Sequence, residues 1–262
     1  MISLFILLFV AHLLGDFFLQ RTSWVRDKEQ HKWKSPQLYI HTLIHFTLLV
    51  AITGLVNLVD EDQAGGIGYF LLPAGVIALS HLVIDGLKLS LQTERTKRTW
   101  FFVDQALHLT ILLGVAVAFA GFDYFPDKQD LRAVIAVVTG AIFLTRPTSF
   151  FIRTIISRWP PDLSDKSETG ITRTVRIADQ RSLENAGELI GMLERLIILI
   201  FILLGKWEGV GFLLAAKSVF RFGDLKEARD RKLTEYVLIG TLLSFGIAIV
   251  TGIATDWLMR AA

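Results

Sequence analysis

Long apolar runs recur along this 262-residue chain, and they constrain its fold more than any other feature. Several of them approach the roughly 20 residues that an α-helix needs to cross the hydrocarbon core of a bilayer. Hydrophobic residues make up 52% of the chain, more than an ordinary soluble domain carries. The first run differs from a cleavable signal peptide, because no Lys or Arg precedes it and no small-residue cleavage site follows. We therefore predict an all-α, polytopic membrane protein.

The apolar runs predict about eight transmembrane helices. They cover residues 2–20, 37–58, 69–91, 101–121, 131–147, 188–205, 209–223 and 235–257. Arg146-Pro147 ends or kinks the fifth span, because proline lacks the amide donor that a continuing helix needs. The stretch SFFIRTIISRW after it is amphipathic, as interfacial helices are.

Lys and Arg residues indicate how these helices are oriented. The loops 21–36, 92–100, 153–187 and 224–234 are rich in Lys and Arg, whereas 59–68, 122–130 and 206–208 hold none or one. Cytoplasmic loops of membrane proteins carry the excess of these residues. The alternation therefore places the basic loops in the cytoplasm and both termini outside.

Three regions follow from this reading. Residues 1–152 form an N-terminal transmembrane bundle, 153–187 a polar cytoplasmic linker with an interfacial helix, and 188–262 C-terminal helices that pack on the bundle. Within the linker, ITRTVRI alternates like a short strand, and Ser182 is a candidate N-cap for the following helix.

Ligand-type side chains lie in pairs within the first four predicted spans, one pair per span. The pairs are His12 and Asp16, His41 and His45, His81 and Asp85, and Asp104 and His108. Each pair has i,i+4 spacing, which places both side chains on one helix face about 6 Å apart along the axis. Ionisable groups in a bilayer face a bundle interior, where they find partners. The pairs therefore predict one shared site in a four-helix bundle.

The predicted topology also sorts these residues by depth, because antiparallel neighbours reverse the order within each pair. The layer deeper in the membrane consists of His12, His45, His81 and His108. The layer nearer the cytoplasm consists of Asp16, His41, Asp85 and Asp104. Since the topology rests on the loops alone, this sorting supports a common site independently.

Imidazole suits zinc and other transition metals, while carboxylate favours harder ions and can bridge two metals. Eight candidate ligands are more than one tetrahedral zinc ion can bind. They therefore predict two ions, or one ion with an outer shell of oriented carboxylates. Zinc is the expected metal, with manganese and iron as alternatives. Two other interpretations stay open: hydrogen bonds that hold helices together, and a bis-histidine haem, against which the three aspartates argue. The absence of Cys excludes thiolate zinc sites and iron–sulfur clusters.

Three cationic side chains are candidates for binding an anion. Lys88 follows the HLVID segment, and Lys217 and Arg221 lie four residues apart in the seventh span. They could clamp a phosphate-like group. Alternatively, Lys217 and Arg221 pair with Glu194 or Asp224, or extend to lipid phosphates.

Two further polar residues, Gln105 and His31, are not expected to belong to the site. Gln105 points about 100° away from its neighbour Asp104 on the helix and is interpreted as packing. His31 lies in a basic loop and is interpreted as solvated. The net charge of +2, with the basic residues in loops, predicts no nucleic-acid partner.

Several segments together resemble a family of bacterial polytopic membrane proteins of unknown function. These segments are HLLGDFFLQ, HTLIH, SHLVIDGLK, DQALH and the later ERLIIL, GFLLAAKSVFRFGDLK and EYVLIGTLLSF. More distantly, the order of His-bearing helices resembles inner-membrane proteins predicted to be metal-dependent hydrolases, related to zinc-dependent phospholipase C and nuclease folds. That likeness implies metal binding by His12, His41, His45, His81 and Asp85, and cleavage of phosphoesters. The Arg-x-x-Thr-His motif associated with that group is missing here.

We therefore expect a metal-dependent hydrolase of the bacterial cytoplasmic membrane, a phosphoesterase acting on a lipid or lipid-linked substrate at the cytoplasmic leaflet. Metals would activate water, and the three cationic side chains would hold the head group. One aspartate would act as general base, and the candidates for this role are Asp16, Asp85 and Asp104. The alternatives are a transporter or channel for divalent metal or protons, and a structural or signalling subunit with a structural metal. The outer halves of the first four spans are almost wholly apolar, which favours a one-sided site over a pore.

Overall fold

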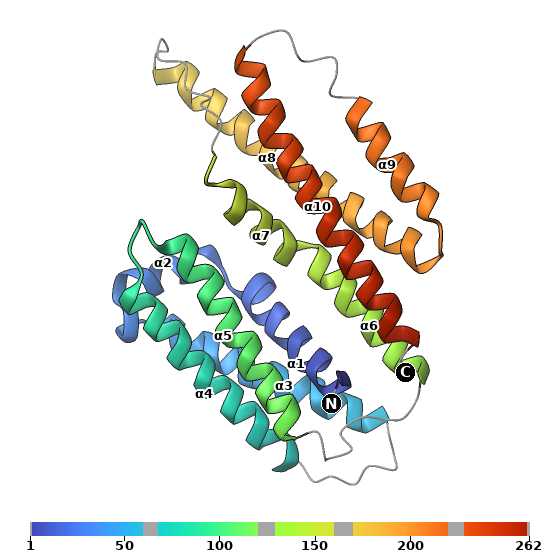
Figure 1. Cartoon of the computed structure of the whole chain (residues 1–262). Helices are drawn as coiled ribbons and strands as arrows, with labels where there is room; N and C mark the ends of the chain where they lie inside the picture. Colours follow the sequence, from blue (N-terminus) through green and yellow to red (C-terminus); the bar gives the residue numbers. More distant parts are fainter. Residues whose placement is uncertain (1, 60–67, 120–128, 160–169, 220–227, 261–262) are drawn as a thin grey trace. The chain divides into compact units, whose positions relative to one another are not determined.

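The structure, a computed structural model, describes residues 2–59, 68–119, 129–159, 170–219 and 228–260. Within these ranges every regular element is a helix and no strand occurs, so the all-α prediction is confirmed (Figure 1). The helices separate into two compact units, one up to Thr139 and one from Gly140 onward. Each unit has a hydrophobic core of its own.

Six helical stretches of the described chain are long and apolar enough to cross a membrane. They are Ile2–Leu19, Pro36–Leu55, Leu71–Leu91, Lys97–Ala118, Leu131–Ile156 and Glu235–Arg260. The predicted sixth and seventh spans are not among them. The apolar half of α8 (Gly170–Leu203) carries three charged residues, and α9 (Trp207–Val219) has only 13 residues. A membrane protein is therefore supported, while the count of eight crossings stays a prediction.

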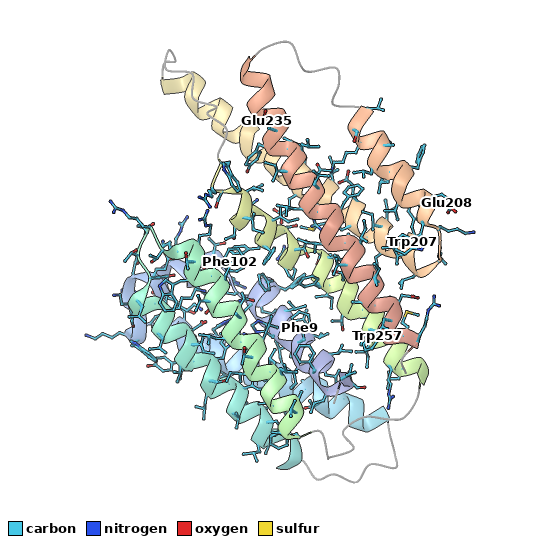
Figure 2. All side chains as sticks on the ribbon, in the orientation of Figure 1. Phe9, Phe102, Trp207, Glu208, Glu235 and Trp257 are labelled. Atoms are coloured by element: carbon cyan, nitrogen blue, oxygen red, sulfur yellow. The ribbon has the colours of Figure 1, made fainter. Side chains whose placement is uncertain are left out.

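Four long helices form the core of the first unit. They are α1 (Ile2–Leu14), α3 (Pro36–Val59), α4 (Gly68–Leu91) and α5 (Lys97–Ala118). Both α1 and α4 pack against α3 and α5, which closes a four-helix bundle. The buried core consists of Leu4, Leu8, Ala11, Leu49, Ala74, Ile77, Leu112, Val115 and Ala116. Phe9 is partly buried and packs against this core (Figure 2).

A short polar segment, which we call the α2 cap, covers one end of this bundle. It consists of α2 (Thr22–His31) and the 3₁₀-helix η2 (Lys32–Lys34), and it follows the π-helix η1 (Gly15–Leu19) that continues α1. The Trp33 indole N–H donates to Ser90 Oγ in the last turn of α4 at 3.0 Å. Lys97, at the start of α5, pairs with Glu29 of α2 at 3.2 Å. The cap is thus attached where α4 ends and α5 begins (Figure 1).

The second unit contains the end of α6 (Gln129–Leu144), α7 (Arg146–Ile156), α8, α9 and α10 (Ala228–Arg260). The helix is interrupted between α6 and α7, and Pro147 lies in the first turn of α7. This confirms the predicted interruption. The buried Arg195 guanidinium of α8 satisfies groups that this break exposes. It donates to the carbonyl oxygens of Leu144 and Thr145 and to the hydroxyls of Ser149 and Ser244.

Two expectations for residues 171–182 differ from the structure. Residues 171–177 (ITRTVRI) lie within α8, and Ser182 lies in its interior, so the predicted strand and N-cap are wrong. A lone strand leaves its backbone amides without partners, whereas a helix satisfies them internally. Along the chain, the boundary between the compact units falls at 139/140, because Leu144 belongs to the second core. Residues 160–169 lie outside the described residues.

Candidate metal centre

All eight predicted ligands meet inside the four-helix bundle of the first unit. His12 and Asp16 come from α1 and η1, His41 and His45 from α3, His81 and Asp85 from α4, and Asp104 and His108 from α5. The five histidines are at most 3% exposed. Each helix thus contributes the two side chains that the i,i+4 spacing placed on one face.

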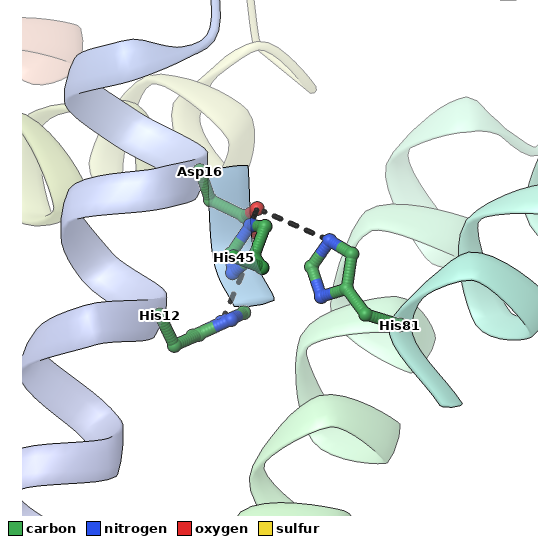
Figure 3. Close-up of side chains that lie close together, drawn as sticks. All are labelled: His12, Asp16, His45 and His81. Carbon is green, nitrogen blue, oxygen red and sulfur yellow. Dashed lines mark hydrogen bonds and ion pairs between the residues drawn. The ribbon is translucent and has the colours of Figure 1, made fainter. Parts of the chain in front are cut away.

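The Asp16 carboxylate lies at the centre of four imidazoles. Its Oδ1 is 3.0 Å from His45 Nε2, 3.1 Å from His41 Nε2 and 3.5 Å from His81 Nε2. His12 Nε2 approaches Oδ2 at 3.7 Å. Figure 3 shows His12, His45 and His81 directed at this carboxylate. Ring nitrogens from three helices therefore converge on a single oxygen-bearing group.

Three overlapping groups of donors have geometries that could hold a metal ion. They are His12, Asp16, His45 and His81; His41, His81 and Asp85; and Asp85, Asp104 and His108. In each group, one ligand atom per residue can be chosen so that all lie within 4.8 Å of one another. His81 belongs to the first two groups and Asp85 to the last two. The donor set is therefore continuous and larger than one tetrahedral ion needs.

The histidines form a layer of contacting rings next to the hydrophobic core. The His81 ring centroid lies 3.9 Å from that of His45 and 4.0 Å from that of His108, and His12 lies 5.2 Å from His108. One helical turn further into the bundle, the same four helices contribute core residues: Leu8, Leu49, Ile77 and Leu112. An apolar layer thus adjoins the histidines on this side.

The carboxylates lie toward the α2 cap, and two of them form ion pairs with lysines. Lys88 Nζ donates to Asp104 Oδ2 at 2.9 Å, and Lys28 Nζ donates to Asp85 Oδ2 at 2.8 Å. Lys28 is 5% exposed, although most of its neighbours in α2 are open to solvent. In the sequence, Lys28 is one of several basic residues in the loop 21–36. Nothing in the loop pattern distinguishes it from the lysines and arginines beside it.

Gln105 also belongs to the site, contrary to its interpretation as packing. Its Nε2 donates to Asp16 Oδ2 at 3.3 Å and to Asp104 Oδ2 at 3.2 Å, and its Oε1 lies 3.3 Å from His12 Nε2. The long side chain overcomes the turn of about 100° that separates it from Asp104 on the helix. An amide next to a buried carboxylate in an apolar span was the available signal.

Gly15 explains how His45 reaches the centre of the site. A Cβ atom at Gly15 would lie 2.3 Å from His45 Cε1, so the imidazole rests directly on the backbone of η1. Only glycine permits this approach. The π-helical turn that begins at Gly15 also carries Asp16, and single π-turns are frequent at functional sites.

Unpartnered donor atoms indicate that these residues fit a metal. Neither ring nitrogen of His108 has a hydrogen-bond partner among the described residues, and the same holds for His41 Nδ1 and Asp104 Oδ1. An unsatisfied buried polar group costs about 1–3 kcal/mol. Imidazole nitrogens combined with carboxylate oxygens suit zinc, manganese or iron. A divalent ion would give several of these atoms a partner.

The chain matches the DUF3307 family over residues 4–130. The description of that family is "Protein of unknown function". The matched region includes all eight donors together with Lys28, Lys88 and Gln105. No curated protein and no solved structure matches the chain.

The two remaining anion-binding candidates lie outside the DUF3307 match. Lys217 is part of α9 in the second unit, where its ammonium contacts the Glu194 carboxylate of α8 and lies over the Phe245 ring. This is the pairing that competed with the anion clamp in the sequence interpretation. Arg221 lies outside the described residues.

Proposed function

We propose that this protein is a metal-dependent hydrolase of the bacterial cytoplasmic membrane, a phosphoesterase acting on a lipid or lipid-linked substrate. The observation that carries the proposal is the continuous donor set, in which His81 and Asp85 each belong to two groups. Shared ligands of this kind suit two neighbouring metal ions, as phosphatases and nucleases use them.

Each group of the site would have a separate role in phosphoester hydrolysis. A bound divalent metal would supply a Lewis acid and an activated water. The water oxygen would bond to phosphorus while the ester P–O bond breaks, and the leaving oxygen would take up the proton that the water has given to a carboxylate. The proton of the water passes to a carboxylate, for which Asp16, Asp85 and Asp104 are the candidates. Gln105 holds two of these carboxylates in place through its amide.

The charge of the site favours an anionic substrate. Three carboxylates and the two ammoniums of Lys28 and Lys88 leave one negative charge when the imidazoles are neutral. One divalent ion would reverse this sign, and a second would add two further positive charges. Because an uncompensated buried charge is unfavourable, a phosphoryl group would restore the balance. A neutral ester or amide substrate would not.

A transporter for divalent metal or protons is the alternative. An ion pathway needs polar groups on both sides of the binding site. Beyond the histidine layer, the described part of the bundle places Leu8, Leu49, Ile77 and Leu112 one turn deeper. This apolar layer supports a site that opens on one side, which suits an enzyme better than a pore.

Elemental analysis of protein purified without chelators, combined with a screen of phosphoesters and phospholipids, tests the proposal. We expect bound divalent metal and metal-dependent release of phosphate or of a phosphorylated head group. His45→Ala and Asp104→Asn should reduce metal content or activity by more than the factor of about 10–100 typical of outer-shell changes. His31→Ala is the matched control, because His31 is exposed and pairs only with Asp27 among the described residues.

Two results would contradict the enzyme. If purified wild-type protein contains no metal, both the metal-dependent hydrolase and the structural-metal hypothesis are wrong. Metal without hydrolysis, but with metal-dependent uptake into proteoliposomes, would establish the transporter instead. A variant that loses metal yet keeps its thermal stability would count against a purely structural ion.

A further inference from the structure

Lys28 is the charged residue of the site that comes from outside the four bundled helices. It lies on α2, a ten-residue polar helix, and it is the buried residue of that helix. Its ammonium touches Asp85, the carboxylate that joins two of the three donor groups. A lysine in such a position is costly unless it is paired.

Specific contacts hold α2 in the position that inserts Lys28. The Trp33 ring lies on Gly86, where a Cβ atom would come within 2.1 Å of Trp33 Cη2. Glu29, next to Lys28, pairs with Lys97. Asp27, on its other side, accepts a hydrogen bond from Ser35 at 2.5 Å. These contacts fix both neighbours of Lys28.

Lys28 and Lys88 both lie on the carboxylate side of the donor set, and each pairs with a different carboxylate. Lys28 holds Asp85 and Lys88 holds Asp104, while the histidine layer faces the apolar core. Lys88 keeps 25% of its side chain exposed, so we take the carboxylate side as the side from which a substrate reaches the donor set. A substrate that reaches the metals would therefore meet two ammoniums.

We propose that Lys28, together with Lys88, binds the phosphoryl group of the substrate. The proposal rests on the metal-dependent function above. When metal ions take over the charge of Asp85 and Asp104, the ammoniums of Lys28 and Lys88 lose their partners and need a new anion. A phosphoryl group can accept hydrogen bonds from both ammoniums and contact the metals with its remaining oxygens. The α2 cap thereby becomes part of the substrate site.

Binding of inorganic phosphate to metal-loaded protein in detergent, measured by calorimetry, tests this role. Lys28→Met should keep its metal and lose phosphate affinity by a factor of about 10–100, the value of a charged hydrogen bond. Lys28→Arg should retain most of the affinity because it keeps the charge. Lys34→Met is the matched control: it removes the same charge from an exposed position in the same cap.

The outcomes separate this proposal from the proposed function. Metal-loaded Lys28→Met that binds phosphate like the wild type overturns the role of Lys28 and leaves the hydrolase intact. Loss of metal in Lys28→Met also overturns it, because Lys28 would then support the metal site. Wild-type protein without metal removes both proposals. A parallel titration with short-chain phosphatidic acid identifies the source of the phosphoryl group: tighter Lys28-dependent binding than that of inorganic phosphate indicates a lipid.

Discussion

At the scale of single residues, Gly15 decides whether His45 can enter the donor set. In Gly15→Ala the new methyl group would meet the imidazole at 2.3 Å, so the ring or the π-helical turn must move. We expect strongly reduced metal binding and a loss of about 1–3 kcal/mol of stability, as in other overpacked interiors. Metal titration and thermal unfolding measure the two effects.

Gly54→Ala is the control for that prediction. Gly54 also lies within a bundle helix, α3, but a Cβ atom there has nothing within 4 Å. Alanine should stabilise the helix by about 0.5–1 kcal/mol and leave metal binding unchanged. Equal metal affinity in both variants would show that the approach of His45 to Gly15 is irrelevant to the site.

Gln105 supports a second prediction at this scale. Gln105→Leu removes the amide that joins Asp16, Asp104 and His12 without removing any predicted ligand. Metal affinity or activity should fall by a factor of about 10–100, as it does when outer-shell partners are lost. Gln30→Leu, at an exposed position of α2, should have no effect. If Gln105→Leu keeps wild-type metal affinity and activity, Gln105 only packs in the bundle.

The eight candidate ligands could be predicted for a reason that does not extend to Lys28 and Gln105. His12, Asp16 and the other pairs follow helical spacing inside apolar segments, where a polar group needs a partner. Lys28 lies in a polar segment between two predicted spans, and its burial depends on how α2 packs on α3 and η2 on α4. That contact between distant segments has no local signature.

At the scale of elements, Trp33 is one of the residues that attach the α2 cap to the bundle. Trp33→Ala should release α2, raise amide hydrogen exchange over residues 22–31 and weaken phosphate binding as Lys28→Met does. Metal content should stay unchanged, because no donor lies in the cap. Trp33→Phe keeps a ring on Gly86 and loses only the hydrogen bond to Ser90. It should behave nearly as the wild type, and unchanged exchange in Trp33→Ala would contradict the attachment.

The helix boundaries illustrate which elements a sequence specifies. Pro147 predicted the break between α6 and α7, because proline removes a local donor. The partner that stabilises the break, Arg195, lies about 50 residues away and had no such signal. Alternation over residues 171–177 predicted a strand, yet seven residues cannot specify a strand without a neighbour to pair with.

At the scale of the whole molecule, the number of crossings depends on whether α8 and α9 span the membrane. The bias of Lys and Arg predicts basic loops in the cytoplasm. It gives the same location for α10 whether α8 and α9 cross the membrane as a pair or do not cross at all. Labelling at the end of α10 therefore cannot separate six crossings from eight, whereas the turn between α8 and α9 can.

The absence of Cys from the chain makes single-cysteine labelling a direct test of this topology. With a membrane-impermeant maleimide, Lys34→Cys and Glu94→Cys should react only after permeabilisation, because the α2 cap and the α4–α5 turn would face the cytoplasm. Arg260→Cys should react in intact cells. Lys206→Cys, between α8 and α9, should also react in intact cells if both helices cross. Protection of Lys206→Cys would reduce the crossings to six, while labelling of Lys34→Cys in intact cells would place the carboxylates, Lys28 and the substrate on the outer side.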